Sequence, residues 1–69
     1  MPDHDMSARL QNDGAWQKAR GKAREQWGEL TDQELDEARG NWDQFVGTVK
    51  DKTGETAENI ERKFKEWTS

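Results

Sequence analysis

The sequence predicts an all-α fold built from four short helices that pack as two α-hairpins. From Asp13 onward apolar residues recur every three or four positions, which is the period of a helix with one buried face. No stretch of four or more residues alternates between apolar and polar as a half-buried strand does. The same helical segment also occurs twice in the chain, which indicates that one helix pair has been duplicated.

The internal repeat has a spacing of 26 residues. The segment WQKARG that begins at Trp16 returns as WDQFVG beginning at Trp42, and Gly28 returns as Gly54. Each copy is expected to form a helix, a terminating glycine, a short link and a second helix. One copy has a single narrow apolar stripe that it cannot bury alone. We therefore expect the two hairpins to cover each other with pseudo-twofold symmetry.

Composition limits the class of protein. A chain of 69 residues forms one small domain. Its 29% hydrophobic and 38% charged residues approach the composition of disordered proteins, whereas four Trp and two Phe favour a folded core. The lack of cysteine excludes disulfides and thiolate metal sites and suits a reducing cytoplasm. No apolar run is long enough for a signal peptide or a membrane span, and a formal net charge of −4 argues against a dedicated nucleic-acid binder.

Residues 1–12 show no usable period, so we assign them to a mobile N-terminal tail before a helical domain at 13–69. The single histidine, His4, lies in this segment. A free amine at Pro2 would make His4 the third residue, a spacing that can bind copper or nickel, but a solvated tail is the simpler interpretation. One imidazole cannot supply the three protein ligands of a catalytic zinc site, so we expect no metal.

The first helix is expected at about 14–27. Its apolar residues fall on one arc roughly 80° wide at about 100° per residue. They are Trp16, Ala19, Ala23 and Trp27. Either Asn12 or Asp13 can accept hydrogen bonds from the unpaired amides at the N-terminus. Gly28 stands where a left-handed residue ends a helix without steric cost.

The second helix, at about 32–39, has the best-defined start. Thr31 and Glu34 have the spacing of a capping box, in which each side chain accepts from the other residue's backbone N–H. Leu30 and Leu35 occupy the two positions of a hydrophobic staple. Both patterns place the N-cap at Thr31.

The remaining helices are expected at about 42–53 and 57–67. Asn41 can cap the third helix, directly after Gly40 ends the second, and Thr56 can cap the fourth. The predicted core of all four helices consists of Trp16, Ala19, Ala23, Trp27, Leu35, Trp42, Phe45, Val49, Ile60, Phe64 and Trp67.

Two segments carry a resemblance to a known family, KAREQWGELTDQEL and NWDQFVGTVKDKTGE, with Trp16 and Gly21 before them. The pattern Trp-x4-Gly-x6-Gly-x2-Thr-Asp, followed by Gly-x-Trp-x-Gln-Phe-Val-Gly, resembles the CsbD-like family of small bacterial stress-response proteins over about residues 14–67. The resemblance implies two orthogonal hairpins, a cytoplasmic bacterial protein induced under stress, and neither catalytic residues nor cofactors. The family usually has an aromatic residue where this chain has Thr53. We expect Trp42, which is extra here, to fill that volume.

The acidic residues favour structural roles over catalysis. They cluster around the second helix as Glu29, Asp32, Glu34, Asp36 and Glu37. A general acid–base pair needs a cleft that separates two pKa values, and a core this small provides little desolvation. The sequence also has no phosphate-binding glycine loop, nucleophile elbow or metalloprotease helix motif. We therefore predict a protein that is not an enzyme.

The basic residues of the first helix do not form one stripe. Lys18 and Lys22 flank one side of the apolar arc, and Arg20 and Arg24 flank the other. This arrangement suits aliphatic stems that lie over the core rim with their charged ends in water. An acidic residue also follows each turn glycine, where a helical-hairpin DNA module would hold a phosphate.

Two glycines at equivalent positions of the repeat, Gly21 and Gly47, lie in mid-helix and face away from the apolar arcs. Each costs about 1 kcal/mol relative to Ala. They are either tolerated in a duplicated unit or leave a smooth patch that a partner approaches closely. Together with Lys18, Lys22 and Arg24 they form the candidate interaction surface.

The sequence thus predicts a non-enzymatic stress-response protein of the cytoplasm, which binds a protein partner or protects other molecules. One alternative is a hydrophilin-like protectant without a specific partner, which a mean hydropathy of −1.42 would suit. The other is a weak nucleic-acid-binding helical-hairpin module.

Mutual dependence of the two halves predicts that residues 1–40 do not fold when expressed alone. Circular dichroism during heating should show a gradual loss of helix in this fragment, but one cooperative transition in the full chain. The full chain should also emit blue-shifted tryptophan fluorescence that moves to the red in denaturant. A cooperative transition in the fragment would show that its half needs no partner.

Overall fold

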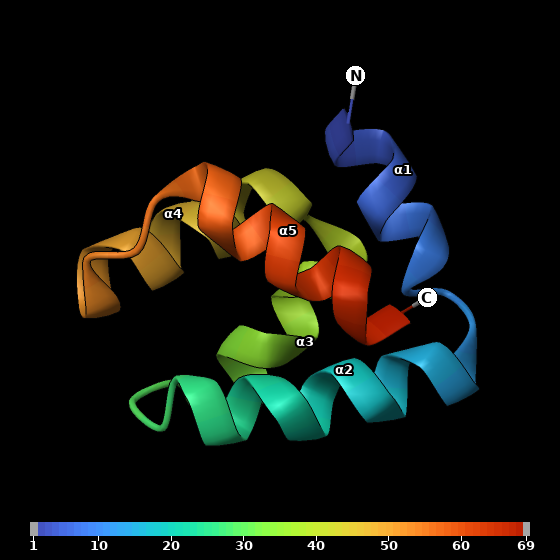
Figure 1. Ribbon diagram of the computed structural model, residues 1–69, viewed down its shortest axis with the longest axis horizontal. Coiled ribbons are helices and arrows are strands. Elements are labelled where there is room, and N and C mark those ends of the chain that lie inside the picture. The colour runs from blue at the N-terminus through green and yellow to red at the C-terminus, as the bar shows by residue number, and fades with distance from the viewer. Residues whose placement is uncertain (1, 69) are drawn as a thin grey trace.

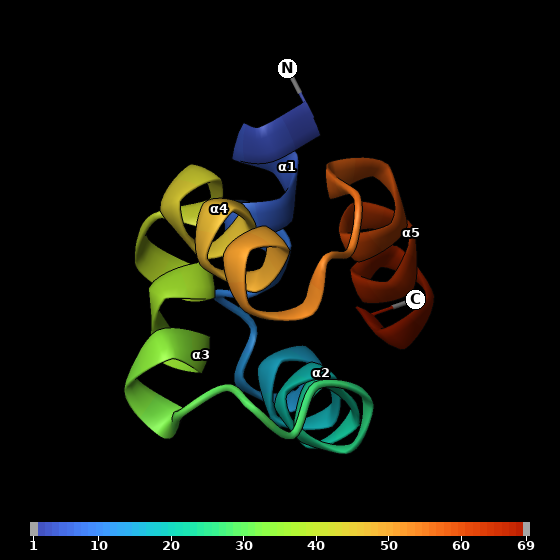
Figure 2. The same ribbon diagram turned by 90° about the vertical axis from the view of Figure 1, so that its left-hand side faces the viewer.

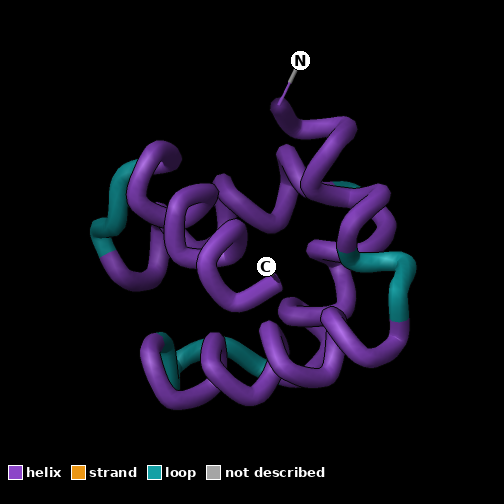
Figure 3. The backbone as a smooth tube through the Cα atoms, turned by 45° about the vertical axis from the view of Figure 1, so that its right-hand side comes forward, coloured by secondary structure: helices purple, strands orange, loops and turns teal. Residues whose placement is uncertain are grey.

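The computed structural model describes the backbone of residues 2–68 and the side chains of residues 6–68. Its helices are α1 Pro2–Arg9, α2 Asp13–Gln26, α3 Asp32–Gly40, α4 Trp42–Thr53 and α5 Ala57–Thr68 (Figure 1). No strand occurs in the described backbone, so the all-α prediction is confirmed. Figure 3 shows that only short loops separate the helices. The predicted number of four helices is wrong, because the described residues form five.

The four expected helices are present, with bounds within one residue of those predicted. The capping box at Thr31 is complete, since Glu34 N–H donates to Thr31 Oγ1 at 3.2 Å and Thr31 N–H donates to Glu34 Oε1 at 2.9 Å. Asn12 is the cap of α2, and its Oδ1 accepts from Ala15 N–H at 3.0 Å. Thr56 accepts from the backbone of the following turn in the same way.

The additional helix is α1, in the segment predicted to be a mobile tail. Met6 and Leu10 are 1% and 0% exposed and belong to the same core as the other helices. This helix has only eight residues. Two apolar anchors four positions apart are too few to establish a period, which explains why the pattern was missed.

The helices pair differently from the predicted hairpins. The most extensive contacts of α2 are with α5, which runs in the opposite direction in Figure 1, and those of α3 are with α4. Figure 2 shows the same two pairs from the side, with α1 above them. Asn41 is at once the C-cap of α3 and the N-cap of α4, so a single residue separates these helices. The expected pairing of α2 with α3, and the pseudo-twofold repeat, are therefore not confirmed.

The glycines at the helix ends also differ from one another. Gly54 has a φ of 79° and ends α4 in the left-handed conformation, as predicted. Gly28 does not, because Gly54 is the only described residue with positive φ, and α2 ends instead at the C-cap Trp27. Gly40 is the last residue of α3 rather than the residue after it.

The core contains every residue predicted for it, with Trp67 partly buried. Phe64 lies at its centre, with its ring centroid 5.0 Å from Trp42, 5.4 Å from Phe45, 5.1 Å from Trp67 and 6.0 Å from Trp27. The residues not predicted are Met6, Leu10, Leu30 and Ala38.

Trp42 does not replace the aromatic residue that is missing at Thr53. The two residues begin and end α4, and eleven residues of helix separate them by about 16 Å at 1.5 Å per residue. Trp42 packs instead against Phe45 and Phe64. Thr53 is partly buried, and its hydroxyl donates to the carbonyl of Val49 at 2.7 Å.

An ion pair connects the start of α3 to the end of α4. Lys52 Nζ lies 2.7 Å from the carboxylate of Glu34, the residue that also completes the capping box. The hydrogen bond from Lys52 lowers the pKa of Glu34, and the backbone N–H of Thr31 lowers it further. One carboxylate therefore both caps a helix and joins two helices.

Replacing two exposed glycines should stabilise the protein. A Cβ added at Gly21 or Gly47 would have no atom within 4 Å beyond its own helix, so Gly21→Ala and Gly47→Ala should each add about 0.5–1 kcal/mol to the free energy of unfolding. Gly54→Ala is the matched control, and it should destabilise the fold by about 1–2 kcal/mol because of its left-handed backbone. Urea titrations followed by circular dichroism measure all three. If all three substitutions changed the free energy of unfolding equally, the left-handed backbone at Gly54 would be contradicted.

The stability contributed by Glu34 should depend on pH. Because its pKa is lowered in the folded state, the charged form stabilises the fold above the ordinary pKa of 4.5, and this contribution is lost as the pH falls through the lowered value. Glu34→Gln should therefore be less stable than the wild type at pH 7, with the difference shrinking below about pH 4.5.

The measurement is the urea midpoint of both proteins between pH 7 and pH 2.5. Glu25→Gln is the control, since the exposed Glu25 side chain has no hydrogen bond or ion pair among the described residues. A difference between wild type and Glu34→Gln that stays constant with pH would show that the carboxylate charge is not the stabilising feature.

Candidate functional site

The structure distributes the predicted interaction residues over two helices. Gly21, Lys18, Lys22 and Arg24 lie on α2, and Gly47 lies on α4, a helix that makes at most minor contact with α2. All five are exposed. Helix packing therefore does not bring them together, and the set remains a prediction.

Arg24 has a partner within the chain. It contacts the carboxylate of Asp32, the first residue of α3, and Arg20 Nη2 lies 3.2 Å from the same oxygen. These side chains are 40–60% exposed, so each pair contributes at most about 1 kcal/mol. They nevertheless place two cations against an anion at the α2–α3 connection, which leaves Arg24 less available to a partner molecule than Lys18 or Lys22.

Arg39 was not singled out in the sequence, yet it makes the densest polar contacts of the described residues. Its Nε donates to the carbonyl of Leu10 at 2.8 Å, and its Nη2 donates to the carbonyl of Gln11 at 3.1 Å and to Asp13 Oδ1 at 3.0 Å. Its guanidinium also lies 5.5 Å from the centre of the Trp16 ring. Arg39 thereby binds two carbonyls of the turn that follows α1 and fastens the α1–α2 connection to the end of α3.

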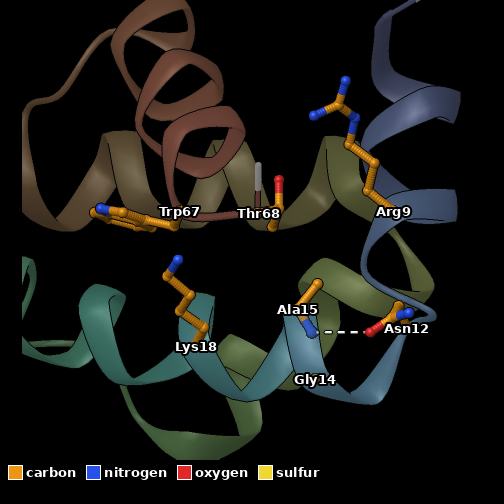
Figure 4. Close-up of a pocket in the computed structure, with 7 residues that line it drawn as sticks. All are labelled: Arg9, Asn12, Gly14, Ala15, Lys18, Trp67 and Thr68. Carbon is orange, nitrogen blue, oxygen red and sulfur yellow. Dashed lines mark hydrogen bonds between the residues drawn. The ribbon is translucent and has the colours of Figure 1, made fainter.

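A groove lies where α1, α2 and α5 meet, with a volume of about 420 Å³. Figure 4 shows Lys18 extending from α2 toward Trp67 of α5, and Arg9 extending from α1 toward the end of α5. Asn12, Gly14, Ala15 and Thr68 complete the lining. Of these residues only Lys18 was predicted to belong to a site. Arg9 could not have been predicted as a site residue, since its position depends on α1, for which the sequence shows no helical period.

A second hollow of about 400 Å³ lies near the turns that follow α2 and α4. Trp27 Nε1 donates to Glu55 Oε2 at 3.5 Å beside it. Its lining contains two acidic residues, Glu29 and Glu55, and the basic residue Lys52, so its charged groups are of both signs. This hollow is less suited to select a charged ligand than the groove at α1, α2 and α5.

Metal-binding groups do not gather in the described part of the chain. No three side chains of His, Cys, Asp or Glu among the described residues converge in a way that could hold a metal ion. The side chain of His4 lies outside the described residues. Among the described residues, no helix is both long enough and apolar enough to cross a membrane.

Comparison with known proteins shows the family. The profile of the family described as CsbD-like matches residues 11–62, which begins after α1 and ends within α5. A UPF0337 protein of Pectobacterium atrosepticum is 42% identical over 57 residues that cover 83% of each chain. The UPF0337 protein YjbJ of Escherichia coli is 35% identical over 54 residues that cover 78% of each chain. No solved structure matches at a significant level. The chain belongs to the CsbD-like family.

Proposed function

We propose that this protein is a non-enzymatic stress-response protein of the bacterial cytoplasm that acts by binding a protein partner through its folded surface. The family supplies the link to stress. The single observation that supports a folded mode of action is the core, in which fourteen hydrophobic residues are buried around the Phe64 ring.

A protectant that acts only by solvation needs no fixed arrangement of its side chains. The composition of this chain, with 38% charged residues, would serve that role equally well without a core. Four Trp and two Phe are costly to such a protein, because exposed rings promote aggregation. The presence of an ordered aromatic core therefore favours a function that depends on surface geometry.

The distribution of charge supports a protein partner rather than a nucleic acid. Several cations are paired within the chain, since Arg20 and Arg24 contact Asp32 while Arg39 and Lys52 bind groups of neighbouring segments. A nucleic-acid binder instead directs many cations at phosphates and loses affinity steeply as salt rises. With a net charge of −4, this chain has little long-range attraction for a phosphate backbone.

The test compares the folded chain with an unfolded chain of almost identical composition. Phe64→Ala should cost about 3–5 kcal/mol, enough to unfold a domain of this size. In cells that lack the native protein, Phe64→Ala should fail to restore survival under the inducing stress, whereas Glu25→Gln, which changes an exposed residue, should restore it.

Both variants must be brought to equal abundance, checked by immunoblotting, because unfolded chains are degraded faster. Full protection by the unfolded Phe64→Ala chain at equal abundance would overturn the proposal and would establish the solvation mechanism in its place.

A further inference from the structure

We propose that the groove between α1, α2 and α5 binds an acidic peptide segment that carries an apolar side chain between two carboxylates. This inference rests on the proposed function, since it names the chemistry of the partner. The groove joins three helices, so its shape exists only in the folded chain.

The groove supplies two cations that have no partner among the described side chains of residues 6–68. Neither Arg9 nor Lys18 forms a hydrogen bond or ion pair with its side chain among the described residues. None of the described residues that line the groove is acidic. Two acidic residues adjoin lining residues in the sequence: Asp13 is bonded to Arg39 at 3.0 Å, and Glu66, next to Trp67, also has an interaction partner. In a protein with a net charge of −4, this groove is therefore a local site for carboxylates.

The groove also has a fixed apolar wall. Trp67 is partly buried and packs on the core, with its ring centroid 5.5 Å from that of Trp27 in an edge geometry and 5.1 Å from that of Phe64. Because these contacts hold the indole in place, an apolar side chain can bury against it at little cost in conformational entropy. Ala15, which is partly buried on α2, adds apolar surface to the lining on the side of Thr68 (Figure 4).

The dimensions favour a short peptide over a nucleic acid. A volume of about 420 Å³ holds a few side chains, and two cations match two carboxylates. A single strand of nucleic acid binds by stacking its bases on accessible ring faces and by many phosphate contacts. The ring of Trp67 is already in contact with two other rings, and the described lining of the groove contains two cations.

The experiment titrates the full-length, ¹⁵N-labelled chain with the capped peptide acetyl-Glu-Leu-Glu-amide at low salt. Saturable shifts are expected at the indole N–H of Trp67 and at the backbone amide of Lys18. The double variant Arg9→Glu with Lys18→Glu should weaken binding at least tenfold. The matched control, Lys50→Glu with Arg62→Glu, makes the same change in net charge at exposed positions outside the groove and should bind as the wild type does.

If the charge-reversed variant fails to fold, Arg9→Gln with Lys18→Gln provides the same comparison with a smaller perturbation. Equal affinity for acetyl-Gln-Leu-Gln-amide would overturn the inference, because the carboxylates would then be irrelevant. Shifts at the same residues with an oligo-deoxythymidine of eight nucleotides, but not with the peptide, would overturn it in favour of a nucleic acid.

The two proposals can fail separately. Should the peptide not bind while Phe64→Ala abolishes protection, the groove assignment falls and the folded mode of action stands. Should the peptide bind while unfolded Phe64→Ala still protects, the groove is a binding site but not the basis of protection.

Discussion

The fold depends on the contacts of one ring, that of Phe64. Four aromatic rings, from the C-cap of α2 and from α4 and α5, lie within 6.0 Å of its centroid, and Phe64 is fully buried. With so few apolar residues in the chain, no second cluster could replace this one if α5 were displaced. Helix α5 contacts α1, α2 and α4, and it is the main partner of α2, which packs on α5 rather than on its sequence neighbour α3.

Polar contacts determine how the helices are joined. Arg39 binds the carbonyls after α1, Asp32 binds two arginines of α2, and Lys52 binds Glu34 across the α3–α4 pair. Each pair is exposed enough that it contributes little energy by itself. Each of these contacts nevertheless has a partner near a helix end, where the direction of the chain is decided, so together they favour one arrangement of the helices over others with a similar apolar core.

Local chemistry in the sequence was sufficient to predict four of the helices and their N-terminal caps. It was not sufficient to predict α1, the ends of α2 and α3, or the pairing of the helices. The capping box at Thr31 and the caps at Asn41 and Thr56 depend on residues three positions apart, so spacing alone predicts them. Pairing depends on side-chain volume at contacts that are distant in sequence. Ala19 and Ala23 stand on α2 at the repeat positions where α4 has larger residues, and small side chains allow another helix to approach closely. The groove could not be predicted, because it needs both that pairing and the position of α1.

The core and the groove differ in how far the family profile covers them. The repeated helices build the core, and the family profile covers residues 11–62, which contain most of that core. Two of the three residues that give the groove its character, Arg9 and Trp67, lie outside this range, and only Lys18 lies within it. Because Arg9 and Lys18 are exposed, their charges can change without altering the packing around Phe64, in which Trp67 takes part. Relatives that share the core are therefore free to differ in what this groove recognises, and a binding role can be tuned there at little cost in stability.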